Sequence, residues 1–161
     1  MTAPSWVQRE AEKRREQERL LQQKSAARLD RVKKVADRAP ALWDKFAAVL
    51  ENHVAEFNLL FRDDKQKVFE VERPASGTLV LKRSPYPSIR MEIFLNLDTR
   101  SVNYQVVRTP RAHGRPSEEI GALPVALDEK GAPHLMDGSH PLALEAASEL
   151  ILKPVLFAPE K

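Results

Sequence analysis

The hydrophobic pattern of the first quarter of the chain is helical but sparse in apolar residues. Residues 5–38 contain no glycine and consist largely of Glu, Arg, Lys, Gln, Ala and Leu, which are good helix formers. Before Leu29 few positions are apolar, and charges of opposite sign recur three or four residues apart. This pattern predicts a charged helix, N-capped by Ser5, that is exposed to solvent or covered by a partner.

From Leu29 onward the apolar positions become regular and form a wide stripe. They recur at steps of three and four residues: Leu29, Val32, Ala36, Ala39, Trp43, Phe46, Leu50, Phe57 and Leu60, with His53 as the one polar member and Val35, Leu42 and Val49 alongside. The width of the stripe is typical of a helix that packs on a sheet. Because Pro40 costs about 3 kcal/mol in a helix interior, we predict two nearly collinear helices, residues 5–38 and 41–61, with a kink or short break at Pro40.

After residue 66 the hydrophobic period changes from helical to two, which indicates strands. Strands are predicted over residues 67–73, 78–83, 88–97 and 101–108, followed by a polar loop over 109–119 and a short hairpin over 123–136. The clearest alternation places Ile89, Met91 and Ile93 on one face of the sheet. The segment 139–153 reads as a helix that has Ser139 as its N-cap and ends at Pro154.

These elements predict an α+β fold, in which a long N-terminal helix, kinked at Pro40, precedes an antiparallel β-meander of 4–6 strands and a C-terminal helix. We expect the helix 41–61 to cover one face of the sheet together with the C-terminal helix. The chain then divides into a projecting charged helix, residues 1–38, and a single α+β domain, residues 39–161. The order of elements resembles small chaperone-like bacterial folds, and a likeness of fold alone implies no function.

Composition and charge narrow the function classes. The chain of 161 residues has no Cys, which excludes disulfides and thiolate metal sites, and it has no apolar run of the length that a signal peptide or a membrane span needs. We therefore expect a cytoplasmic protein. The net charge of +3 is uneven: residues 1–38 and 82–115 each carry +5, residues 39–81 carry −2 and residues 116–161 carry −5. Nucleic acid or acidic proteins are partners that such basic zones suit.

The sequence contains none of the common catalytic motifs: no GxGxxG, no phosphate-binding loop, no GxSxG and no HExxH. We therefore predict no enzyme, no cofactor and no metal. His134, Asp137 and His140 have residue types that ligate metals, but the favoured interpretation is a turn followed by a helix cap. His53 is interpreted as a partly buried, hydrogen-bonded histidine rather than a pH-sensitive residue at a dimer seam.

Two basic loops are expected to meet, since consecutive antiparallel strands place alternate loops at the same end of a sheet. They bring together a candidate anion-binding set: Lys82, Arg83, Arg90, Arg108, Arg111 and Arg115. The alternative is a loop edge that the acidic C-terminal part neutralises, Glu118 and Glu119 included.

The favoured function is a non-enzymatic protein-interaction or assembly module, which uses the N-terminal helix either to self-associate as a homo-oligomer or to dock a protein partner. The expected contact residues are Leu20, Leu21, Leu29, Val32 and Val35. A nucleic-acid-binding accessory protein that uses the basic loop edge and the basic helix is the alternative. A small enzyme or ligand binder with a pocket under the C-terminal helix is a third hypothesis.

Overall fold

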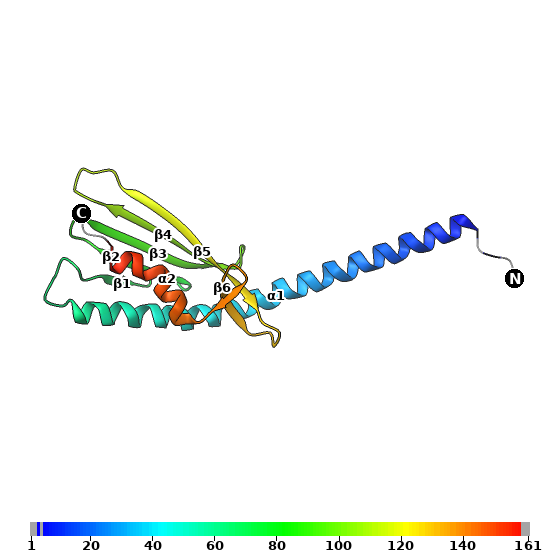
Figure 1. Cartoon of the computed structure of the whole chain (residues 1–161), viewed down its shortest axis with the longest axis horizontal. Helices are drawn as coiled ribbons and strands as arrows, with labels where there is room; N and C mark the ends of the chain where they lie inside the picture. The colour runs from blue at the N-terminus through cyan, green and yellow to red at the C-terminus, as the bar shows by residue number, and fades with distance from the viewer. Residues whose placement is uncertain (1–2, 4, 159–161) are drawn as a thin grey trace. The chain divides into compact units, whose positions relative to one another are not determined.

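The computed structural model of the chain describes residue 3 and residues 5–158. It consists of a long N-terminal helix, a seven-stranded antiparallel sheet and a C-terminal helix, which confirms the predicted α+β fold (Figure 1). The elements are α1 (Trp6–Leu60), β1 (Glu70–Glu72), β2 (Thr78–Arg83), β3 (Ser88–Asn96), β4 (Ser101–Thr109), β5 (Ser117–Leu127), β6 (Pro133–Asp137), β7 (His140–Leu142) and α2 (Leu144–Leu156).

The helix α1 begins with a reciprocal cap and continues without a break through Pro40. The backbone N–H of Gln8 donates to Ser5 Oγ at 3.3 Å, and the N–H of Ser5 donates to Gln8 Oε1 at 3.0 Å, so the expected N-cap is confirmed. The expected break at Pro40 is wrong, because the two predicted helices are one. Pro40 lies on the exposed side, whereas Ala39 and Leu42 beside it are buried, and this packing maintains the helix through the proline.

The chain forms two compact units, Met1–Lys34 and Val35–Lys161, and the boundary between them falls inside α1. The division predicted from the sequence lies between residues 38 and 39. The core begins four residues earlier because Val35, which is 7% exposed, already belongs to it.

The sheet is a simple meander in which every strand pairs with the next one along the chain, from β1 to β7. In β3, Ile89, Met91 and Ile93 are buried, while Arg90 is exposed on the opposite face, as the alternation predicts. The strand β1 is a short exception, since all three of its residues are exposed.

One face of the sheet packs against both helices and forms the core of the second unit. The part of α1 that follows Val35 contributes Phe46 and Leu50, and α2 contributes Ile151, all of them buried in one cluster with the inward residues of the strands. The two helices are also joined by a polar contact, in which His53 Nδ1 lies 2.6 Å from the buried Ser148 Oγ. The interpretation of His53 as a partly buried, hydrogen-bonded histidine is therefore confirmed.

The last third of the chain differs from the prediction in three places. The residues 117–119, expected in a loop, begin β5, because they pair with the end of β4. The segment His140–Leu142 is the strand β7 rather than the first turn of a helix, because Gly138, at φ +60°, closes a tight turn back onto β6. The helix α2 therefore begins at Leu144, without Ser139 as its cap, and it continues through Pro154 to Leu156.

Candidate interaction surfaces

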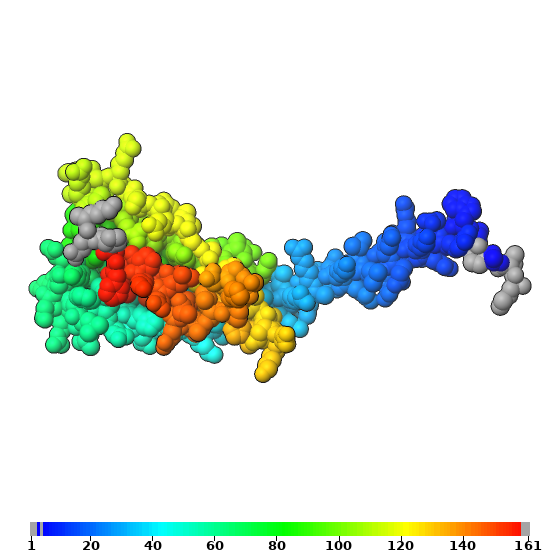
Figure 2. Space-filling view, in the orientation of Figure 1, coloured from blue at the N-terminus to red at the C-terminus, as the bar shows by residue number. Residues whose placement is uncertain are grey.

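The first candidate surface is the part of α1 that lies in the N-terminal unit. From Trp6 to Lys34 every residue is exposed except Ala11 and Val32, which are half-buried (Figure 2). Three leucines are among the exposed residues: Leu20 is 45% exposed, Leu21 is 63% exposed and Leu29 is 69% exposed. The expected contact residues therefore remain accessible, with the exception of Val35, which is buried in the core.

The helix in this segment is exposed, so the contacts that support it are local. Ion pairs join Glu10 to Lys13, Glu16 to Arg19, and Asp30 to Lys34. The hydrogen bond from Arg19 lowers the pKa of Glu16 and raises the pKa of Arg19 itself. Pairs at this spacing contribute only about 0.2–0.5 kcal/mol each to an isolated helix, so the segment is suited to further stabilisation by a partner.

The apolar and basic residues of this segment lie on adjoining sides of the helix. At 100° per residue, Leu29 and Val32 fall within about 80° of Leu21, and we name these three residues the apolar stripe. A second row runs beside it at steps of four and three residues, and we name it the basic ridge: Lys24, Arg28 and Arg31.

The charge of the segment is concentrated in its second half. Residues 6–18 contain four basic and four acidic residues, whereas residues 19–34 contain six basic residues and one acidic residue, a net charge of +5. That single acid, Asp30, already pairs with Lys34 at 3.1 Å. The apolar stripe therefore lies within a strongly cationic stretch of helix.

The second candidate surface is the basic end of the sheet, where the structure brings the two predicted loops together. Ile89 pairs with Arg83 on β2 and with Arg108 on β4, so both arginines lie on the helix-covered side. Lys82 pairs directly with Arg90, and these two side chains lie on the opposite face. The alternation of the strands thus divides the candidate anion-binding set between two faces of the sheet.

Most of the cations at this end already have partners. Lys82 Nζ lies 3.1 Å from Glu72, Arg90 lies 3.9 Å from Glu92, and Arg108 lies 2.6 Å from Glu119. Arg108 also donates to the carbonyl of Pro154 at 3.0 Å, near the C-terminal end of α2.

The remaining three members of the set differ in their surroundings. Arg83 donates to the carbonyl of Pro87 at 2.9 Å and lies over the ring of Phe69. Arg111 and Arg115 are exposed, and within the described part of the chain their side chains make no hydrogen bond or ion pair. The loop between β4 and β5 therefore offers two accessible cations at this end of the sheet.

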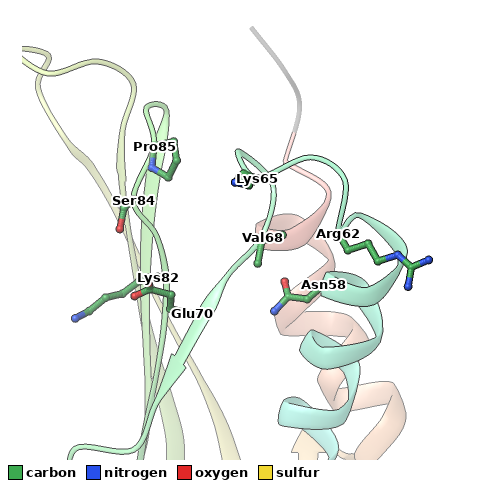
Figure 3. A pocket seen from close by; sticks show the side chains of 8 residues that line it. All are labelled: Asn58, Arg62, Lys65, Val68, Glu70, Lys82, Ser84 and Pro85. Atoms are coloured by element: carbon green, nitrogen blue, oxygen red, sulfur yellow. The ribbon is translucent and has the colours of Figure 1, made fainter.

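An open cleft of about 380 Å³ lies between the end of α1 and the start of β1 (Figure 3). Its lining residues are Asn58, Arg62, Lys65, Val68, Glu70, Lys82, Ser84 and Pro85. Figure 3 shows that the side chains of Arg62 and Lys82 extend to opposite sides rather than toward a common point. The Asn58 side chain donates to the carbonyl of Phe69 at 2.8 Å and accepts the backbone N–H of Phe69 at 2.9 Å. These two bonds attach the loop before β1 to α1.

A second hollow, of about 280 Å³, is lined only by residues of α2: Ala146, Glu149, Leu150, Lys153 and Pro154. It therefore lies on the outer surface of that helix, and not beneath it, where the third hypothesis placed a ligand pocket. Neither of these two hollows brings several polar groups toward one point, as small-molecule sites do.

His134, one of the histidines of the C-terminal part, has a structural partner. His134 Nε2 lies 2.8 Å from Asp128 Oδ2, while Asp128 Oδ1 accepts the backbone N–H groups of Lys130 and Ala132 at 2.8 and 2.9 Å. The bond to His134, followed by these backbone bonds, lowers the pKa of Asp128. Among the described residues no group of three or more His, Asp or Glu side chains is arranged to hold a metal ion.

Comparison with known proteins finds no matching family model, no matching curated protein and no matching solved structure. Within residues 3 and 5–158, no helix has both the length and the apolar character needed to cross a membrane. The interpretation of the surfaces therefore depends on the residues themselves.

Proposed function

We propose that this protein is a non-enzymatic interaction module, in which the helical segment of residues 6–34 binds a protein partner. The observation that carries the proposal is the exposure of Leu20, Leu21 and Leu29 on a stretch of helix that no core residue covers. Exposed leucines at helical spacing are the anchors by which an amphipathic helix enters a groove or pairs with another helix. The sheet and its two helices then serve as the folded body that carries this segment.

The arrangement of the second unit supports a binding role over catalysis. Its open cleft is lined by charges that do not converge, and His53 and His134 are engaged in contacts that stabilise the fold. General acid–base catalysis requires a positioned group within reach of a bound substrate. The proposal includes a cytoplasmic location, as expected from the composition of the chain.

Nucleic-acid binding by the basic loop edge is the less supported alternative. Its four cations on strands are divided between two faces of the sheet, and three of them, Lys82, Arg90 and Arg108, are already paired with glutamates. A nucleic-acid backbone is bound best by a continuous row of accessible cations. Arg111 and Arg115 alone do not form such a row.

The test uses the full chain and compares two sets of exposed leucines. The variant L20Q/L21Q/L29Q replaces the proposed contacts with a good helix former, and the control L59Q/L60Q replaces leucines that are 63% and 73% exposed near the end of α1. Light scattering measures self-association, and affinity capture from the native cell extract measures binding of other proteins. We expect the first variant to lose the association and the control to retain it. Equal association by both variants would contradict the proposal.

A further inference from the structure

The charge pattern beside the exposed leucines indicates which partner the helix takes, provided that the proposed function holds. We propose that the segment of residues 14–32 binds an acidic amphipathic helix of another protein. The partner's apolar residues contact the apolar stripe, Leu21, Leu29 and Val32, and its carboxylates contact the basic ridge, Lys24, Arg28 and Arg31.

Arg28 occupies the same heptad position as Leu21. Arg28 lies one heptad after Leu21, and Arg14 lies one heptad before Leu21. A helix that contacts Leu21 along a heptad seam therefore meets Arg14 and Arg28 on either side. An apolar partner would leave both guanidinium groups without compensation, whereas a partner with carboxylates beside its apolar seam would pair with them.

The same pattern disfavours a second copy of this chain. In a parallel, in-register pair of helices each residue meets its own equivalent, so Arg14 would face Arg14 and Arg28 would face Arg28. In an antiparallel pair centred on the apolar stripe, the flanking row of one helix meets the same row of the other, which would bring the two basic ridges together. The segment of residues 19–34 offers only Asp30 as a counter-charge, and Lys34 already occupies it.

The ridge itself is accessible. Lys24, Arg28 and Arg31 are exposed, and within the described part of the chain none of the three makes an ion pair. The carboxylates of an acidic partner can therefore form ion pairs with these three side chains without breaking an existing pair.

Nucleic acid is disfavoured as the occupant of this surface. Residues 6–18 of the helix are electrically neutral, with Glu10 and Glu18 on the side of the helix that continues the stripe. A phosphate backbone would be repelled there and would leave Leu21 and Leu29 uncovered. An acidic helix with its own apolar residues accounts for both the leucines and the cations.

The test measures binding of the full chain to a labelled synthetic peptide by fluorescence anisotropy. The peptide has 21 residues, with Leu at heptad positions a and d and Glu at positions e and g, so that its own charges oppose its self-association. A matched peptide carries Gln in place of Glu. We expect saturable binding of the acidic peptide that weakens at high salt, and about tenfold weaker binding of the Gln peptide.

Two variants with the same change in net charge separate the ridge from general attraction. K24Q/R28Q/R31Q removes the ridge, and R15Q/K33Q/K34Q removes three cations on other sides of the helix. We expect about a tenfold loss of affinity for the ridge variant and at most about a twofold loss for the control. L21Q/L29Q is expected to weaken binding as much as the ridge variant, because both parts of the surface contribute.

Several results would overturn the inference: no binding of the acidic peptide, equal losses in the two Gln variants, or tighter binding of a 20-nucleotide single strand that the leucine substitutions leave unchanged. A leucine-dependent dimer in light scattering would also overturn it, although the proposed function would then stand as self-association. If the leucine variant loses captured proteins but the acidic peptide does not bind, the proposed function holds and this choice of partner is wrong.

Discussion

His53 Nδ1 and Ser148 Oγ lie 2.6 Å apart and connect α1 to α2 within the core of the second unit. The Ser148 hydroxyl is fully buried and the imidazole is half-buried, so this contact satisfies polar groups that water cannot reach easily. A buried hydroxyl without a partner would lower stability, which explains why the two residues occupy facing positions on the two helices.

The substitution Ser148→Ala is expected to lower the free energy of unfolding by about 1 kcal/mol, because it removes this hydrogen bond and leaves the imidazole nitrogen without its partner. Urea denaturation followed by circular dichroism measures the change. Ser139→Ala, at an exposed position, is the control and should leave stability unaltered. Equal effects of the two substitutions would show that the contact between the helices contributes nothing.

Gly121→Ala is expected to destabilise the protein by about 1–3 kcal/mol. Gly121 pairs with Tyr104 on the neighbouring strand, and an added Cβ would collide with the tyrosine ring. The loss should be smaller when the same substitution is made in a Tyr104→Leu background, because the ring is then absent. A thermal-denaturation cycle of the four proteins measures the coupling, and a coupling of zero would show that the ring does not restrict this position.

Pro40→Ala is expected to raise stability by about 1–3 kcal/mol, because it restores a backbone donor inside α1 and removes a poor helix former. Pro40 is exposed, so no packing is lost. The melting temperature of the full chain is the measurement. Pro154→Ala in α2 provides a second case, since its carbonyl can still accept the bond from Arg108. A lower melting temperature for Pro40→Ala would mean that the fold requires the proline's geometry.

The stability conferred by Asp128 is expected to disappear at acid pH. Because the folded state lowers the pKa of this carboxyl below its ordinary value of 3.8, its ionised form favours the folded protein at higher pH. The contribution begins to fall near that ordinary value and is lost as the pH drops through the lower, folded value. Unfolding of the wild type and of Asp128→Asn should therefore differ at pH 6 and converge toward about pH 2. Glu129→Gln is the control, and a constant difference for Asp128→Asn would contradict the assignment.

A chain that begins at Val35 is expected to retain the fold of the second unit, since every buried core residue lies at or after this position. A chain that begins at Leu42 should be less stable by about 2 kcal/mol or more, because it lacks Val35 and Ala39. It also lacks Arg38, which donates to the carbonyl of Gly131. Circular dichroism and thermal melts of the two chains make the comparison, and similar melting temperatures would place the true start of the core later.

The positions of β2, β3 and β4 follow from periodicity in the sequence. The alternation of β3 identified its buried face, because side chains of a strand point to opposite sides. The helical stripe that includes Trp43 and Phe46 identified the face of α1 that packs on the sheet. The proximity of Lys82 and Arg108 at one end of the sheet followed from antiparallel connectivity, and that proximity is all that the sequence determined about the basic site.

The tertiary structure decided what competing local signals left open. Pro40 and Pro154 signal helix ends, but burial of Ala39 and Leu42 in α1, and of Val155 and Leu156 in α2, maintains both helices. Pro141 signals a helix start, but pairing with Met136 makes its segment a strand. Burial also separated Ala39, which belongs to the core, from Leu29, which remains exposed in the same periodic series. Spacing along a helix shows which residues share a face, whereas only the folded chain shows how much of that face is covered.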